Sequence, residues 1–350
     1  MRISNNVLAV FAIALILSSV FGTVAVFFTA ERLETGYGSK VTGRASATGL
    51  VQFTVVTPIT DINLSAYLHQ DNSTVVLTWA NMSQDNVSIF ITNNISEGFN
   101  YGNPNVTGLT GFSWSDPNAY KVQQRYYKAG VWNNDVFTLI DSTMGKFDIP
   151  IYHSTQIPGE VEFNTISLPL RPSNLSLNNI FRWSENGDSI GTYNPFKAPD
   201  PGFDSSLYFS GLGWWGDIVE INVTKTYWLG LVDTAYNLTV VGEVPTEHIK
   251  VHLYRSTQIP TEVEFNTVGW HSVYKRCNMT AVLGPGSANV TDGDVIAVYN
   301  PFKTPDPGFD SSIYFSGLGW WGEITCLEPG KGYTFGIVQN EYDWEYDPEP

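Results

Sequence analysis

Short stretches in which apolar and polar residues alternate recur along most of this chain. Residues 74–79 (TVVLTW) and 87–91 (VSIFI) are examples, and Asn, Gly, Asp or Pro residues bound them. A period of two is typical of half-buried strands, and no long stretch after residue 35 has the 3.6-residue period of a helix. The pattern predicts an all-β protein.

The exception is an apolar segment at the amino terminus. Residues 7–30 carry no charge, and a helix of this length spans roughly 36 Å, enough to cross a ~30 Å hydrocarbon core. We expect residues 1–30 to be a retained signal anchor, with the bulk of the chain outside the cell. The alternative is a cleaved signal peptide, which would make the protein secreted. A pilin-like filament helix is a third option, although the short basic leader of pilin precursors is missing.

The second half of the chain contains a long internal repeat. YNPFKAPDPGFDSSLYFSGLGWWGDI at 193–218 returns at 299–324 with three substitutions, and 152–165 returns at 254–267. The shifts of 102 and 106 residues match an independent domain better than a solenoid unit. We expect two tandem β domains, 151–246 and 247–340, and a frayed acidic tail at 341–350. Residues 227–232 and 238–242 are expected to pair as the hairpin that closes the first domain.

Two motifs in these repeats resemble a known module. Phe-Asn-Thr-Ile-Ser-Leu-Pro-Leu occupies 163–170 in the first copy, and Leu-Glu-Pro-Gly-Lys-Gly-Tyr occupies 327–333 in the second. They resemble a repeat of prokaryotic, particularly archaeal, exported cell-surface proteins, which begins with the first motif and ends with the second. The resemblance implies a β domain on the cell surface and brings no reaction with it.

The region before the repeats resembles a different module. Segments 75–79, 87–92 and 125–131 are similar to strands of a fibronectin type III domain, in which a core tryptophan lies on the second strand and a tyrosine pair on the sixth. Trp79 and the pair Tyr126-Tyr127 match those positions. The resemblance implies a β-sandwich at 59–150, and the Gly-, Ser- and Thr-rich residues 31–58 are expected to be a stalk.

Composition and charge narrow the range of partners. Only 15% of the residues are charged, 14% are aromatic, and the net charge is −16. This balance suits extracellular β modules better than helical cytosolic proteins. An acidic surface repels phosphate backbones, so nucleic acid is not an expected partner. The expected partners are the membrane, through the amino-terminal helix, and other surface proteins, glycans or copies of the chain itself.

Sites of covalent modification support the extracellular prediction. Asn-x-Ser/Thr sequons without a central proline predict an N-glycosylated surface. They begin at Asn63, Asn72, Asn81, Asn86, Asn94, Asn105, Asn174, Asn222, Asn237, Asn278 and Asn289. Cys277 and Cys326, the two cysteines of the chain, both fall in the second repeat and predict a disulfide in an oxidising compartment. Two free thiols or a metal pair are the alternatives, although neither cysteine has a Cys or His neighbour at zinc spacing.

The sequence contains no recognisable catalytic set. Gly-x-Ser-x-Gly, His-Glu-x-x-His and a phosphate-cradling Gly-Lys loop are all missing, and the five histidines are scattered. His153 is replaced by Arg255 in the second repeat, so the two copies do not share a catalytic histidine. We therefore name no catalytic residue and do not expect an enzyme.

The repeated block carries the candidate binding residues. Its adjacent tryptophans, Trp214-Trp215 and Trp320-Trp321, point to opposite sides of a strand. An exposed member of each pair can stack on a sugar or a partner protein. The alternative, which we favour, is that each pair packs under its own loop or against the neighbouring repeat.

The same block contains four repeated aspartates. Asp200, Asp204, Asp306 and Asp310 offer hard oxygen ligands, which makes calcium the one cofactor to consider. Asp-Pro-Gly is also an ordinary turn sequence, and the spacing fits no EF-hand. We favour the turn.

Taken together, these features predict a cell-surface structural or adhesive protein that acts by noncovalent contact. A carbohydrate-binding surface protein that uses the tryptophan loops is the alternative. A surface hydrolase is a more distant one.

Overall fold

The computed structural model describes residues 64–349 except 80–85, 134–135, 154–162, 199–200, 233–234, 257–264, 285–288 and 305–306, together with the backbone of strands β1 (Gly43–Ala45) and β2 (Val51–Phe53). The predicted anchor or signal at 1–30 and most of the predicted stalk at 31–58 lie outside these residues. In the part of the chain that is described, no helix is both long and apolar enough to span a bilayer. The chain divides into two units, and residues 1–60 with 134–136 form the first, in which β1 and β2 pair.

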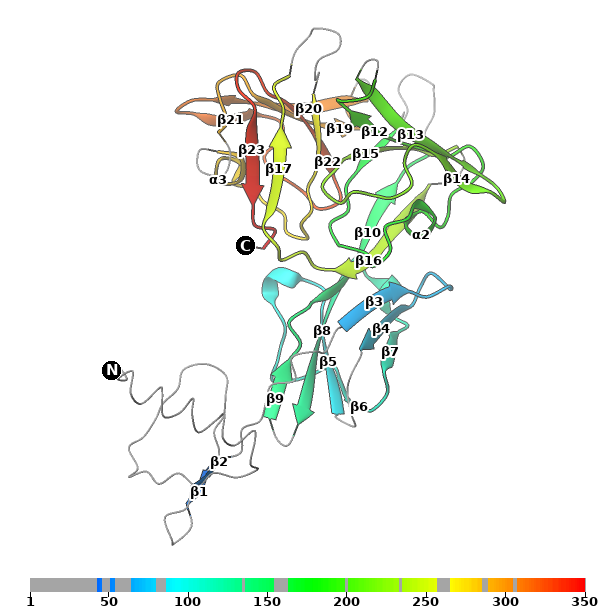
Figure 1. The fold of residues 1–350 in the computed structure, drawn as a ribbon, viewed down its shortest axis with the longest axis vertical. Coiled ribbons are helices and arrows are strands. Elements are labelled where there is room, and N and C mark those ends of the chain that lie inside the picture. Colours follow the sequence, from blue (N-terminus) through cyan, green and yellow to red (C-terminus); the bar gives the residue numbers. More distant parts are fainter. Residues whose placement is uncertain are drawn as a thin grey trace. The chain divides into compact units, whose positions relative to one another are not determined.

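The second unit begins with a β-sandwich of antiparallel strands (Figure 1). Its strands are β3 (Leu64–Leu68), β4 (Val75–Trp79), β5 (Asn86–Thr92), β6 (Val106–Leu109), β7 (Ser113–Asp116), β8 (Gln124–Asn133), β9 (Val136–Leu139) and β10 (Met144–Ile151). One sheet has the order β3-β4-β7, and the other has the order β6-β5-β8-β10, with β9 also on β8. This is the strand order of a fibronectin type III-like sandwich.

Aromatic side chains hold the two sheets together. Trp79 on β4 and Tyr127 on β8 are buried, as the sequence predicts, whereas Tyr126 points to the opposite face of β8 and is buried in the core of the first repeat with Ile149 and Leu170. The expectation that both tyrosines pack across the sandwich is therefore wrong for Tyr126. The Tyr127 ring lies 6.4 Å from that of Trp114 on β7, and its hydroxyl donates a 2.9 Å hydrogen bond to Asp116 on the same strand. A buried hydroxyl needs such a partner, so this bond fixes β7 against β8.

The sandwich and the first repeat share strand β10. Along its full length β10 pairs with β16 (Tyr236–Glu243), from Met144 opposite Glu243 to Ile151 opposite Tyr236. The predicted boundary at 150/151 therefore cuts through a strand. The predicted hairpin of 227–232 with 238–242 is also wrong. The first segment, β15 (Tyr227–Gly230), pairs with β11 and β12, whereas the second, β16, pairs with β10.

Each repeat folds into a five-stranded antiparallel sheet with one short helix. The first copy has the order β11 (Asn164–Ile166), β15, β12 (Ser189–Asn194), β13 (Gly202–Phe209), β14 (Gly213–Gly216), with helix α2 (Leu177–Ile180). The second copy has the order β18 (Asn266–Gly269), β22 (Gly332–Gly336), β19 (Val295–Asn300), β20 (Gly308–Phe315), β21 (Gly319–Gly322), with helix α3 (Met279–Leu283). Two single-turn helices, Ile95–Glu97 and Ala119–Lys121, lie in the sandwich.

The carboxyl terminus is not a frayed tail. Strand β23 (Tyr342–Tyr346) pairs with β17 (Ile249–Leu253), just as β16 pairs with the end of β10. Tyr342, Trp344 and Tyr346 alternate with acidic residues and are buried, so the period of two marks a strand that the acidic composition conceals. Each repeat therefore ends on a strand that returns to its own first strand.

The two repeats meet around an approximate two-fold axis. Tyr193 of the first copy stacks on Phe265 of the second at 4.1 Å between ring centroids, and Tyr299 stacks on Phe163 at the same distance. Tyr193 and Tyr299 hold equivalent positions, as do Phe163 and Phe265. The contact is therefore the self-complementary kind that a homodimer makes, formed here within one chain.

Residues on this axis face their own equivalents, and there the copies must differ. Thr226 corresponds to Gly332, and a Cβ on Gly332 would overlap the Thr226 methyl group. Ser167 corresponds to Gly269, where a Cβ would lie 2.9 Å from that of Ser167. In each pair only one copy has room for a side chain.

Candidate interaction surfaces on two duplicated hairpins

Each repeat ends its sheet in a tight hairpin made from the repeated block. On β13 and β14, Leu207 lies opposite Trp215 and Tyr208 opposite Trp214. The turn requires a positive φ at Gly211 (84°) and Gly213 (83°), which glycine alone adopts without cost. The hairpin of β20 and β21 repeats this register, and the two hairpins extend from opposite sides of the paired repeats (Figure 1).

The first tryptophan of each pair faces inward. Trp214 packs edge-on against Phe181 at 5.8 Å and Tyr208 at 5.7 Å between centroids. Trp320 packs on Tyr314 at 5.6 Å and donates an Nε1 hydrogen bond of 3.2 Å to the Leu283 carbonyl. These two side chains anchor the hairpins to α2 and α3.

The second tryptophan of each pair is open to solvent. Trp215 is 77% exposed and Trp321 is 69% exposed, because alternation turns them to the face opposite the core. The leucines at the turn tips, Leu212 and Leu318, are 83% and 74% exposed. Turn positions usually carry polar residues, so an apolar tip with an adjacent open tryptophan is a distinctive surface.

Large apolar side chains are exposed at equivalent positions of the two repeats. Most of the exposed large apolar residues in the described part of the chain fall in equivalent pairs of the two repeats. The pairs are Phe196 and Phe302, Phe203 and Phe309, Leu207 and Ile313, Phe209 and Phe315, Leu212 and Leu318, Trp215 and Trp321, and Val232 and Val338. Of these residues, the sequence pattern indicates only the tryptophans as candidate binding residues. The missed signal is the apolar alternation of 203–209 running into an apolar turn.

Most of these residues share one sheet face. Tyr193 lies opposite Phe203, and Leu207 lies opposite Trp215, so the period of two puts these side chains and Phe209 on the same side. We call this side, with its counterpart in the second copy, the aromatic face. Its inner end contacts the other repeat through Tyr193, and its outer end at the hairpin is uncovered within the chain.

The aspartates beside this face are held by protein groups. Lys197 Nζ lies 3.4 Å from Asp204 and 3.1 Å from Asp217, and the hydrogen bond to Asp217 raises the pKa of Lys197 above its usual value. Asn194 donates to the second oxygen of Asp204. A calcium ion here would compete with an ammonium group and an amide.

The second copy repeats this arrangement. Lys303 lies 3.2 Å from Asp310, and Asn300 donates to Asp310. Asp200 and Asp306 lie outside the described residues. Within those residues, no group of three His, Cys, Asp or Glu side chains is placed to hold a metal.

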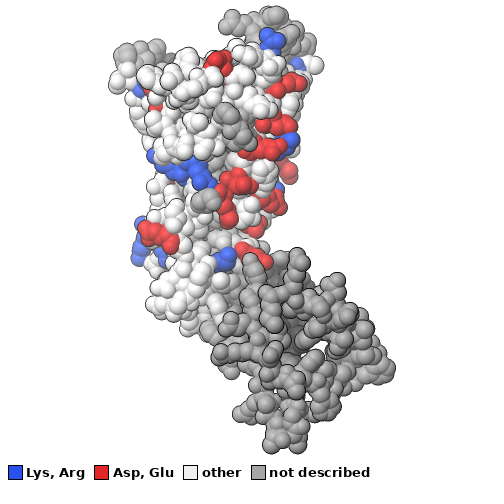
Figure 2. All heavy atoms as spheres, turned by 90° about the vertical axis from the view of Figure 1, so that its left-hand side faces the viewer, with Lys and Arg blue, Asp and Glu red and all other residues white. Residues whose placement is uncertain are grey.

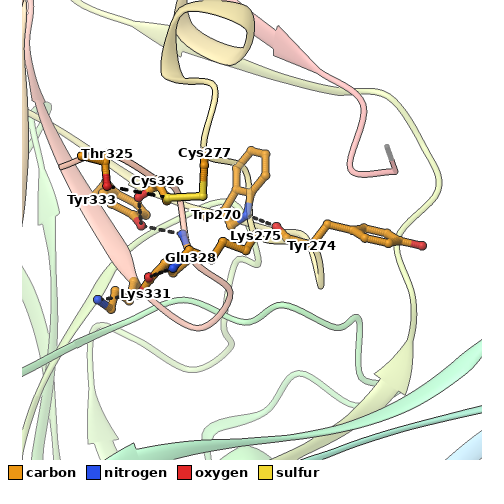
Figure 3. Close-up of polar contacts among 9 residues, drawn as sticks. All are labelled: Trp270, Tyr274, Lys275, Cys277, Thr325, Cys326, Glu328, Lys331 and Tyr333. Atoms are coloured by element: carbon orange, nitrogen blue, oxygen red, sulfur yellow. Dashed lines mark hydrogen bonds and ion pairs between the residues drawn. A yellow bond between two sulfur atoms is a disulfide. The ribbon is translucent and has the colours of Figure 1, made fainter. Parts of the chain in front are cut away.

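The two cysteines form a disulfide near the second hairpin (Figure 3). The turn that follows Cys326 is the Leu-Glu-Pro-Gly-Lys-Gly-Tyr motif. Glu328 makes ion pairs with Lys331 at 2.7 Å and Lys275 at 2.6 Å, and its backbone N–H donates to the Tyr333 hydroxyl at 2.7 Å. These contacts show that the motif closes a turn, and they contain no reactive arrangement.

The corresponding turn of the first copy keeps the tyrosine. Asn222 N–H donates to the Tyr227 hydroxyl at 2.7 Å, and Asn222 Oδ1 accepts from the Thr224 N–H in place of the glutamate and its lysines. Both copies have a backbone bridge beside this turn, between Ser176 and Glu220 in the first and between Arg276 and Leu327 in the second, and the second adds the disulfide. The same turn is thus stabilised by different side chains in the two copies.

Acidic side chains gather unevenly on the surface. Figure 2 shows a band of them over one side of the repeats, with a smaller basic cluster beside it. On β17 and β23, Lys250 pairs with Asp343 at 2.6 Å and with Glu345 at 3.0 Å, and His248 bonds Asp347 at 2.8 Å. These ion pairs on β23 lie in the segment that was expected to be a frayed tail.

The described sequons lie mainly at the surface. Of their asparagines, Asn86, Asn94, Asn105, Asn174, Asn222, Asn237, Asn278 and Asn289 are exposed and Asn72 is half-buried. Asn63 and Asn81 lie outside the described residues. Exposure is compatible with the predicted glycans, which stay a prediction.

Comparison with known proteins adds little to this description. No protein-family model matches the chain, and no curated protein matches it. Among solved structures, the chicken CNTN1 FN1–FN3 domains cover 79% of this chain and 94% of their own, at 14% identity and a TM-score of 0.15. A TM-score this low carries no argument, so the sandwich is assigned from its own strand order. The fold defines an all-β protein with a fibronectin-like sandwich and two homologous β domains.

Proposed function

We propose that this chain is a cell-surface structural or adhesive protein that acts by noncovalent contact. Its contact surfaces are the two hairpins and the open ends of their aromatic faces. The amino-terminal segment holds it at the membrane, and glycans cover parts of the remaining surface.

The proposal rests on which parts of the two repeats have remained similar in sequence. The block that contains the hairpins is identical at 23 of 26 positions, whereas 166–192 and 268–298 share few residues. A recent duplication alone would leave both regions equally similar. Within the block, the apolar side chains that point to solvent are kept as fully as those that point inward, and solubility alone does not favour an exposed leucine or tryptophan.

The test is the variant L212S/W215S/L318S/W321S of the full chain, made in cells that carry the protein. Serine at these exposed positions removes apolar contact area and leaves the core intact. We expect cell-to-cell attachment, and retention of the protein in washed envelopes, to fall severalfold. The control is F112S/W183S, which changes two exposed aromatics outside the hairpins. Unchanged attachment with the hairpin variant at the normal surface level would refute the proposal.

A carbohydrate partner is the second candidate, and the open tryptophans favour it. Trp215 and Trp321 present ring faces on which a sugar can stack, each beside a lysine–carboxylate pair able to bond hydroxyl groups. A shallow groove of about 330 Å³ adjoins the second hairpin, lined by Asn278, Thr280 and Trp320 among others. On this candidate, W215A/W321A loses binding to a polysaccharide array, and L212S/L318S keeps it.

A further inference from the structure

We propose that the occupant of each open aromatic face is the same face of a second copy of this chain, so that the protein assembles into open-ended arrays. This inference rests on the proposed function and names its partner. It commits to self-association, and sugars or lipids become alternative outcomes of the test.

Each open aromatic face is continuous with an interface that the chain already makes. The inner end of the aromatic face associates with its own equivalent, since Tyr193 stacks on Phe265 and Tyr299 stacks on Phe163. Phe203 continues the surface from Tyr193, at 5.8 Å between centroids, toward Leu207 and Trp215. The same type of surface that joins two repeats within the chain therefore extends, uncovered, to each hairpin.

The uncovered part of each aromatic face has enough apolar area for a weak specific contact. Phe203, Leu207, Phe209, Leu212 and Trp215 together expose on the order of 500 Å² per hairpin, if a large side chain contributes about 150–250 Å² when fully open. Pairing two such faces buries about 1,000 Å² in total, near the lower limit for a specific interface. A single contact is therefore weak. Contacts made by many copies held on one membrane reinforce each other through their high local concentration.

The number of uncovered patches on one chain determines what kind of assembly forms. A closed two-fold dimer forms when a chain has one self-complementary patch. This chain has two such patches, and the hairpins that carry them extend from opposite sides of the paired repeats (Figure 1). Each added copy leaves one patch free, so the assembly does not close after two copies. An open-ended chain of contacts is the expected product.

Because each chain has two patches, variants that lack one patch or both should form assemblies of different size. The full chain is studied in a nonionic detergent by sedimentation velocity, from about 10 μM to about 1 mM. The wild type should form a concentration-dependent series of species beyond the dimer. L212S/W215S and L318S/W321S, which each remove one patch, should stop at the dimer. The variant with all four substitutions should stay at the size of its detergent-bound monomer, and F112S/W183S should behave as the wild type.

The variant with four substitutions also controls for association through the amino-terminal segment, which it retains. Self-association is overturned if this variant forms the same series as the wild type, or if the wild type is monomeric throughout. In the second case, binding of the wild type but not of this variant to polysaccharides or lipid vesicles would keep the contact function and replace the partner. Binding to neither, together with unchanged cell attachment, would remove both proposals.

Discussion

His271 gives the sharpest stability prediction, because it is an ionisable group buried where the two repeats meet. Its Nδ1 donates a 2.6 Å hydrogen bond to the Leu168 carbonyl of the first copy, and its backbone N–H donates to the Tyr346 hydroxyl at 3.3 Å. Burial and, to a smaller extent, the Arg171 charge lower the pKa of His271 to about 4, although the hydrogen bond to Leu168 opposes this shift. The ring is therefore neutral at pH 7.

The magnitude follows from the difference between the folded and unfolded states. An unfolded histidine has a pKa of 6.5, so the unfolded chain takes up a proton between pH 6.5 and about 4 while the folded chain does not. Stability is complete above pH 6.5 and falls as the pH drops toward 4. At about 1.4 kcal/mol per pH unit, the full loss is about 3 kcal/mol.

The substitution H271N isolates this effect, because an asparagine amide can donate to the Leu168 carbonyl and does not titrate. Urea unfolding, followed by tryptophan fluorescence at pH 7, 5.5 and 4, should show the wild type losing about 3 kcal/mol more than H271N. H153N, at an exposed histidine, should follow the wild type. Parallel losses in wild type and H271N would show that this reasoning is wrong.

Three further predictions test other parts of the fold. Removing the disulfide with C277S/C326S should cost about 3–4 kcal/mol of unfolding free energy, measured in urea, because its loop of 49 residues is then free in the unfolded chain. G332T should destabilise the repeat contact by about 1–3 kcal/mol, and the swapped pair T226G/G332T should recover most of it in the same assay. The hydrogen bond to Asp347 raises the pKa of His248, so its stabilisation is complete below pH 6.5 and is lost as the pH rises through the folded pKa. The protection factors of the β23 amides, which are corrected for the pH dependence of intrinsic exchange, should be lower at pH 8 than at pH 6, and H248A should remove the difference.

The sequence predicts the sandwich and the duplication well, because both depend on local signals. Alternation identifies the strands, and Trp79 with Tyr127 identifies the sandwich core, whereas Tyr126 is buried in the core of the first repeat. The sequence misses which strands pair, because β15 and β16 are neighbours along the chain and still lie in different sheets. β16 pairs with β10 because β10 lies at the edge of the sandwich sheet, and the local sequence of β16 does not indicate which sheet edge it will join.

For the candidate site, the sequence identifies the tryptophan pairs and leaves open which member faces solvent. Alternation alone says that the two point to opposite sides, and the core side is fixed by where α2 and α3 pack. Phe181 on one copy and Leu283 on the other fix Trp214 and Trp320 inward. The sequence also does not reveal that Tyr193 and Phe265 lie together, since a contact between two repeats leaves no trace in the spacing of either.

The approximate two-fold axis explains both where the copies differ and where they agree. On the axis, equivalent residues compete for one volume, so Thr226 and Gly332 have to differ. Away from the axis, equivalent residues meet different neighbours, and differences such as the disulfide of one copy become possible. The hairpins are far from the axis and have freedom to diverge, yet they have kept the same exposed tip and the same exposed tryptophan. Packing within the chain does not demand that identity. A common partner for both hairpins would account for it, and on our proposal that partner is a second copy of the chain.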